Sequence, residues 1–327
     1  MTQDHDHGHG SGCAHQQGGT QDRGRHQGGA HGHGGAGGHA HGDSHGHTHM
    51  DFGQMLPLLV QEAELFMPAY VQAADWLREQ RPDPGLIVDA GSGPGVISGL
   101  FAEKFPGARI VAVDGAEPLL EEARARAGRL GFADRFSTIE AELSEGIGDL
   151  EYPADLLWAS RSLHHVGDQR AALTGFVRSL APGGTLALLE GGLPTRFLPR
   201  DTGIGRPGLE ARIDAVHDEW FTRMRTELPG SVAETEDWPA LLEAVGLRHT
   251  ATRTFLLDLP APVSDEARAF AVTALTRRRE GLAEGLDAED LATLDRLLDP
   301  ADKASAHHRS DVFVLTAMTV YVGVKPE

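Results

Sequence analysis

The stretch Val88–Gly95, with the sequence VDAGSGPG, decides the fold of this chain. The apolar run Leu86–Ala90 is typical of a buried strand, and a helical pattern follows the glycines from about Val96 to Phe105. A glycine-rich turn between a strand and a helix leaves backbone N–H groups open to a ligand, because glycine has no Cβ. In an open α/β sheet, ligands bind at the carboxyl end of such a strand.

Strands and helices alternate on both sides of this turn. A helical pattern covers 54–80, and Pro68 should interrupt it near Met67. The alternation predicts an α/β fold with a doubly wound, mostly parallel sheet and helical insertions. After the first strand, strands are expected at 109–113, 136–139, 155–159, 185–189, 248–257 and 312–323; helices are expected at about 117–130, 168–180, 209–227, 238–245, 265–280 and 288–298.

Residues 1–49 differ in composition from the rest of the chain. They contain 12 of the 18 histidines and 15 of the 41 glycines. This segment contains too few apolar residues to offset the entropy that ordering would cost. We therefore expect a disordered tail at 1–49 and one domain at 50–327. Within that domain we expect a core at 86–190 and helical insertions at about 192–232 and 260–308.

Charge and hydropathy exclude several classes of protein. The formal net charge is −19, and −17 of it falls outside the tail. Such a surface repels phosphate backbones, so we expect no nucleic-acid partner. No apolar run is long enough to span a membrane and no signal-peptide pattern is found. Cys13 is the single cysteine, which excludes an internal disulfide. We therefore expect a cytoplasmic enzyme, whose oligomeric state the sequence leaves open.

Asp114 limits the class of ligand that the glycine turn can bind. It ends the second strand, 23 residues after Gly91, where a carboxylate can accept hydrogen bonds from both hydroxyls of a ribose. The sixth position of a dinucleotide fingerprint is Val96 instead of glycine, which disfavours NAD, and no phosphate-binding Gly-Lys-Ser/Thr follows. The pattern favours a nucleoside without a pyrophosphate; a plain strand–helix turn is the alternative.

Five motifs, in order, resemble those of class I S-adenosylmethionine (SAM)-dependent methyltransferases, including UbiE-like and other small-molecule members. Val88–Gly95 is similar to the first motif and Asp114 to the ribose-binding acid of that family. In the stretch after the third strand, Ala141 and Glu142 replace the family's Gly and Asp. The other similar segments are Asp155–His165 around the fourth strand, Leu180–Leu186 before the fifth and Trp238–Gly246 before the sixth.

The resemblance implies a seven-stranded Rossmann-like sheet with an antiparallel last strand. It also implies SAM as cofactor, S-adenosylhomocysteine (SAH) as product, and a small-molecule acceptor methylated by in-line displacement. Asp89 would hold the methionyl ammonium, Gly91 and Gly93 would let the backbone approach, and Asp114 would hold the ribose. The full expected cofactor-binding set is Asp89, Gly91, Ser92, Gly93, Gly95, Asp114, Gly115, Ala141, Glu142 and Ser160.

Other residues have two interpretations each. His164 and His165 follow the fourth strand and are catalytic candidates as general bases, or else packing residues. Arg161 either contacts an acidic substrate or is solvated. Trp220 and Met224 are four residues apart and share a helix face, which more often faces a core than a lid.

The histidines of the tail allow a second function class. The spacing of His5, His7 and His9, and of His45, His47 and His49, permits weak chelation of divalent metal ions. Incidental metal binding by a low-complexity segment is one interpretation. The alternative to an enzyme is a metal-handling protein whose methyltransferase-like domain senses SAM or is inactive.

Overall fold

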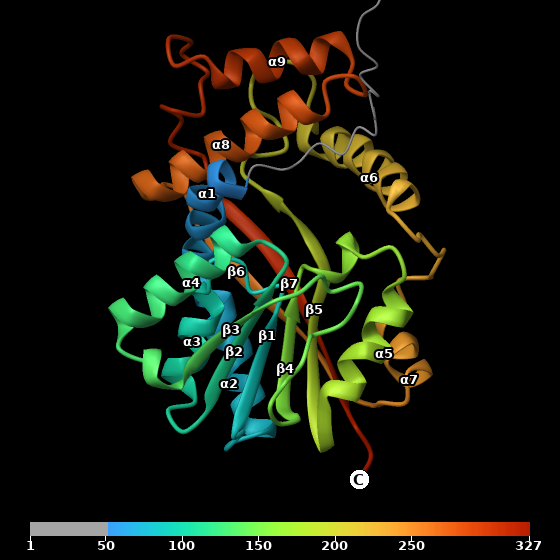
Figure 1. Cartoon of the computed structure of the whole chain (residues 1–327). Helices are drawn as coiled ribbons and strands as arrows, with labels where there is room; N and C mark the ends of the chain where they lie inside the picture. The colour runs from blue at the N-terminus through green and yellow to red at the C-terminus, as the bar shows by residue number, and fades with distance from the viewer. Residues whose placement is uncertain (1–51) are drawn as a thin grey trace, which may run out of the picture. The chain divides into compact units, whose positions relative to one another are not determined.

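A seven-stranded sheet forms the centre of the computed structural model, which describes residues 52–327 (Figure 1). The strands are β1 (Leu86–Ala90), β2 (Arg109–Asp114), β3 (Phe136–Glu140), β4 (Ala154–Ser160), β5 (Leu180–Arg196), β6 (Arg248–Leu259) and β7 (Val314–Val324). Their order is β3-β2-β1-β4-β5-β7-β6. The pairs from β3 to β5 are parallel, and β7 is antiparallel to both β5 and β6. The predicted fold class is confirmed.

Helices cover both faces of this sheet (Figure 1). One face carries α2 (Met67–Gln80), α3 (Val96–Lys104) and α4 (Glu117–Leu130), and the other carries α5 (Gln169–Ser179) and α7 (Trp238–Ala244). β1 contributes Ile87 to the apolar core on the α3 side and Val88 to the core on the α5 side. Burial on both faces explains why this strand is a continuous apolar run. The remaining helices are α1 (Phe52–Leu65), α6 (Leu209–Glu227), α8 (Asp265–Gly281), α9 (Ala288–Leu298) and the short 3₁₀ turns η1 (Ala133–Arg135) and η2 (Leu163–His165).

Local sequence signals explain where several helices begin and end. The break expected at Pro68 is present, since α1 ends at Leu65 and α2 begins at Met67 with the proline in its first turn. Gly131 ends α4 in the left-handed conformation, with φ of 78°. Asp168 caps α5 by accepting the N–H of Ala171 at 2.8 Å.

β5 is longer than predicted from the sequence. We expected a strand at 185–189 between a turn at 182–184 and a loop beyond 192, whereas the strand runs from Leu180 to Arg196. Its last part pairs with β7, for example Leu193 with Ala317. That partner lies far away in the sequence, and its hydrogen bonds outweigh the poor strand propensity of the glycines and prolines.

The carboxyl ends of β1, β2, β4 and β5 meet at one edge of the sheet, because these strands are parallel. The glycine turn follows β1 at this edge, where Asp114 and Ser160 end β2 and β4 and Glu190 lies within β5. α6, α8 and α9 fall in the two stretches where we expected insertions, while the expected tail at 1–49 lies outside the described residues. Within residues 52–327 no helix has the length and apolar character needed to cross a membrane.

Candidate functional site

The glycine turn is attached to the second strand and to the loop after the fourth. The N–H groups of Gly91 and Ser92 both donate to the carbonyl oxygen of Val113, at 2.8 and 3.0 Å. A Cβ on Gly91 would lie 2.6 Å from the Cβ of Ser162, closer than two such atoms can approach. Gly91 therefore brings the loop after β4 against the turn.

Gly93 and Gly95 both have positive φ but face different surroundings. A Cβ on Gly95, where φ is 71°, would lie 2.7 Å from the Cβ of Ala123, so this glycine lets α3 and α4 pack closely. At Gly93, where φ is 52°, nothing lies within 4 Å of a Cβ position. Gly93 is therefore the point of the turn that a ligand can approach.

The carboxylate of Asp114 binds the same turn. Its Oδ2 accepts the N–H of Gly93 at 2.9 Å, and its Oδ1 accepts that of Ala116 at 3.0 Å. Burial raises the pKa of this carboxyl, and the backbone N–H groups oppose that rise. Each oxygen keeps a second lone pair, so Asp114 can accept ligand hydroxyls while it holds the turn.

Asp89 is a buried carboxyl one residue before the end of β1. It is 2% exposed, and Ser98 of α3 donates to its Oδ2 at 2.7 Å. Burial raises its pKa to about 7, with a lowering effect from Ser98 and a further rise from Asp114. Among the described residues no cation pairs with it, so a cationic ligand group would stabilise its charged form. The sequence analysis missed Ser98, because nothing in its helix marks it.

The other predicted cofactor-binding residues lie at the same edge of the sheet. The N–H of Ala141 donates to the carbonyl oxygen of Asp114 at 3.1 Å. A Cβ on Gly115 would lie 2.6 Å from Oε1 of Glu142, so that carboxylate lies over the glycine. Ser160 ends β4. The structure thus brings the ten predicted residues together at the ends of β1 to β4.

Glu190 also lies at this edge of the sheet, and the sequence analysis did not identify it as a site residue. It follows the apolar core of β5 and is 3% exposed. Its Oε1 accepts the N–H of Leu163 at 2.9 Å, and its Oε2 lies 3.0 Å from Nδ1 of His164. The signal was the one that identified Asp114, an acidic residue directly after a buried apolar run.

His165 lies beside His164 with its ring centroid 4.1 Å away. Desolvation by the surrounding loop lowers the pKa of His165 to about 4, and nearby His164, Arg161 and Arg225 lower it further against the opposing carboxylate of Glu190. An imidazole with so low a pKa is neutral at physiological pH but a weak proton acceptor.

Arg161 is paired with a carboxylate of this chain, and 45% of its side chain is exposed. Its Nη1 lies 2.5 Å from Oε1 of Glu62 in α1, and its backbone has a φ of 52°, which is unusual for a residue with a side chain. The ion pair between Arg161 and Glu62 connects α1 to the loop after β4. The first helical segment therefore reaches the edge that carries the glycine turn.

α6 reaches the same loop from the other side. The ring centroid of Phe221 lies 5.8 Å from that of His164. Nη1 of Arg225 donates to the carbonyl oxygens of His164 and Val166, at 2.9 and 2.5 Å. Trp220 is 40% exposed, so our expectation that this face is buried in the core is wrong for that residue. Only the first half of α6 is buried, because its second half extends from the insertion to η2.

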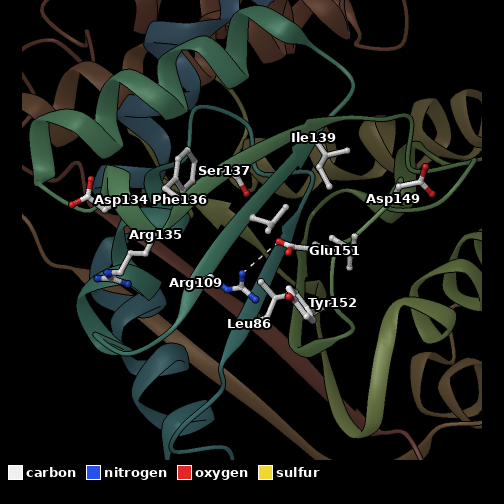
Figure 2. A pocket seen from close by; sticks show the side chains of 12 residues that line it. Leu86, Arg109, Asp134, Arg135, Phe136, Ser137, Ile139, Asp149, Glu151 and Tyr152 are labelled. Atoms are coloured by element: carbon white, nitrogen blue, oxygen red, sulfur yellow. Dashed lines mark ion pairs between the residues drawn. The ribbon is translucent and has the colours of Figure 1, made fainter.

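A separate cavity of about 370 Å³ opens where the first three strands begin (Figure 2). Leu86, Arg109 and Phe136, the first residues of β1, β2 and β3, line it. Figure 2 shows the ion pair between Arg109 and Glu151 across this cavity, at 3.7 Å. The glycine turn follows the opposite end of β1, so this cavity is not the candidate cofactor site.

The predicted weak metal ligands of the tail lie outside the described residues. In the part of the chain that the structure describes, no group of three or more His, Cys, Asp or Glu side chains could hold a metal ion. The metal-handling alternative therefore rests on the tail sequence alone.

Comparisons with known proteins point to the family that the motifs resemble. A family profile described as a methyltransferase domain matches residues 88–186. Trans-aconitate 2-methyltransferase of Acidovorax ebreus is 32% identical over 275 residues, which cover 76% of this chain and 98% of that enzyme. The enzyme of the same name from Methylobacterium radiotolerans is 29% identical over 237 residues, covering 68% of this chain and 88% of the relative.

Among solved structures, the N-methyltransferase NodS from Bradyrhizobium japonicum superposes with a TM-score of 0.43 at 14% identity, covering 80% of this chain and 97% of NodS. The family assignment rests on the similarity in sequence. The alignments with the two trans-aconitate 2-methyltransferases cover 88% and 98% of those enzymes. The chain belongs to the class I SAM-dependent methyltransferases.

Proposed function

We propose that this methyltransferase transfers the methyl group of SAM, by in-line displacement, to a small polycarboxylate acceptor. The observation that carries the cofactor half of the proposal is the backbone of Gly93, which a ligand can approach. Asp114 accepts its N–H, and the buried Asp89 lies four residues earlier in β1. The name of the relatives supports the acceptor half, because trans-aconitate is a tricarboxylate.

In this proposal the residues around the turn hold the two ends of the cofactor. Asp89 binds the methionyl ammonium, because its buried carboxyl has no cation partner among the described residues. Gly91, Ser92 and Gly93 present backbone to the methionyl part, and Asp114 accepts the ribose hydroxyls through its remaining lone pairs. Gly95 acts by letting α3 and α4 pack, so its effect is on the shape of the turn.

The adenine half of the site is formed by Gly115, Ala141 and Glu142. The carboxylate of Glu142 lies over Gly115, next to the end of β2. Ser160 lies at the end of β4 and borders the space between the cofactor and the acceptor. When bound, SAM supplies an electrophilic methyl group on a sulfonium sulfur, in line with an attacking oxygen.

The acceptor side is formed by the loop after β4 and the second half of α6. A carboxylate is already ionised at neutral pH, so its attack requires no general base. The low pKa of His165 agrees with that expectation, since this ring is a weak base. The role assigned to the protein is then to position the acceptor, which can supply roughly 7–11 kcal/mol of barrier reduction in favourable cases.

Calorimetric titration of SAH into the full chain tests the proposal. We expect micromolar binding, at least tenfold weaker in Asp114→Ala, because a hydrogen bond to a charged group contributes about 1.5–3 kcal/mol. Asp149→Ala, an exposed acid on the loop before β4, is the matched control and should bind like the wild type. Absence of SAH binding, or equal affinity in Asp114→Ala, would contradict the assignment.

A further inference from the structure

Arg225, in the last turn of α6, is a guanidinium that no carboxylate neutralises among residues 55–327. Its Nη1 donates to the carbonyl oxygens of His164 and Val166, which carry no net charge. Its Nε and Nη2 have no partner within that part of the chain. Two hydrogen bonds thus hold Arg225 against the loop after β4, while no group of residues 55–327 binds its other donors or compensates its charge.

The neighbouring charged groups are committed to other partners. Arg161 is paired with Glu62 of α1. Glu190 is buried and binds the N–H of Leu163 and the ring of His164. Neither carboxylate therefore compensates Arg225.

The ring of His164, on the loop that Arg225 binds, uses one nitrogen within the protein. Its Nδ1 is bound to Glu190, whereas its Nε2 has no partner in the part of the chain described here, and the side chain is 22% exposed. Phe221, one turn before Arg225, covers the ring from α6. Arg225 and the ring of His164 are therefore both held at the contact between α6 and the loop after β4.

The loop that Arg225 binds adjoins the cofactor turn. Ser162 lies against Gly91, and His164 follows two residues later in η2. Residues 162–166 thus contact the turn through Ser162 and Arg225 through the carbonyl oxygens of His164 and Val166. That arrangement is what an acceptor beside a methyl donor requires.

We propose that Arg225 binds a carboxylate of the acceptor beside the loop that carries His164, and so selects small polycarboxylates. The inference rests on the proposed function and assigns the recognition of its acceptor to one side chain. Residues 50–327 carry a net charge of −17 and therefore repel polyanions. An anionic acceptor thus needs a local cation that is not already paired. Guanidinium groups suit this task because they bind carboxylates with two parallel hydrogen bonds.

The test is calorimetric binding of tricarballylate, a saturated tricarboxylate, to the full chain saturated with SAH. No methyl transfer takes place with SAH, so the measurement reports binding alone. We expect tricarballylate to bind the wild-type complex and to bind at least tenfold more weakly to Arg225→Gln. Glutamine keeps an uncharged donor on a shorter side chain, so the change removes the charge together with the contacts that Nη1 makes to the loop carbonyls.

Two further variants separate charge from structure. Arg223→Gln removes an exposed arginine two residues earlier on the same helix and should leave tricarballylate affinity unchanged. Arg225→Lys keeps the charge without the two-pronged geometry and should fall between the wild type and Arg225→Gln, which keeps the test decisive if the glutamine variant fails to fold. SAH affinity should stay within twofold in all three variants.

The outcomes distinguish this inference from the function on which it rests. If SAH binds but tricarballylate does not, or if Arg225→Gln and Arg225→Lys bind it as the wild type does, the role of Arg225 is refuted and the cofactor site stands. If SAH itself does not bind, the proposed function fails and the inference fails with it.

Discussion

Replacement of Asp89 by asparagine should change how the stability of this protein depends on pH. The carboxyl is 2% exposed, and its pKa is raised from an ordinary 3.8 to about 7, mainly by burial. This change in the pKa of Asp89 corresponds to about 4 kcal/mol of folding free energy. Because the folded state holds this proton more tightly than the unfolded state, the stability that it contributes is complete below pH 4 and is lost as the pH rises to about 7.

Asp89→Asn has no proton to lose and can still accept the hydroxyl of Ser98. Relative to the wild type, its free energy of unfolding should therefore increase by up to about 4 kcal/mol between pH 4 and pH 8. Urea denaturation at half-unit intervals of pH measures this difference. Asp149→Asn, which changes an exposed carboxyl, is the control and should leave the pH dependence of the wild type unchanged.

The same residue predicts a proton linkage of SAH binding. An ammonium group beside Asp89 favours the carboxylate, so SAH binding near pH 6 should release a proton from the wild type and none from Asp89→Asn. Calorimetry in two buffers of different ionisation enthalpy measures that proton. Parallel pH–stability curves for the wild type and Asp89→Asn would refute the reasoning, because they would show that Asp89 ionises normally in the fold.

Two further predictions concern the turn and the loop beside it. Gly95→Ala should destabilise the fold by roughly 2–4 kcal/mol in urea unfolding, because its Cβ would meet Ala123 at positive φ. Gly93→Ala should cost only about 1–2 kcal/mol of stability but weaken SAH binding by a larger factor; equal stability losses in the two variants would be inconsistent with the packing. His165→Gln should reduce the loss of stability as the pH falls from 6.5 to 4, because the folded state takes up a proton there less readily than the unfolded state. If His165→Gln and the wild type lost the same free energy of unfolding between pH 6.5 and pH 4, the low pKa of His165 would be contradicted.

Short-range patterns predicted much of the fold and the cofactor half of the site. The run Leu86–Ala90, the glycines after it and Asp114 lie within 30 residues, so periodicity and turn chemistry identify them locally. Glu190 carried the same kind of signal as Asp114 and could have been predicted. The pairing of Arg161 with Glu62, across 99 residues, could not, because nothing near Arg161 indicates which helix lies above it.

The sequence by itself determined the order of strands and helices, the turn that needs positive φ, and the family that these motifs resemble. Those properties depend on residues close together in the chain, whose backbone limits and apolar spacing act locally. Only the tertiary structure decided that β5 extends to Arg196 along β7, that Glu190 holds one nitrogen of His164, and that Arg225 has no counter-ion among residues 55–327. These depend on which distant groups meet and which are already satisfied, because the energies of hydrogen bonds and ion pairs depend on distance and burial instead of sequence separation.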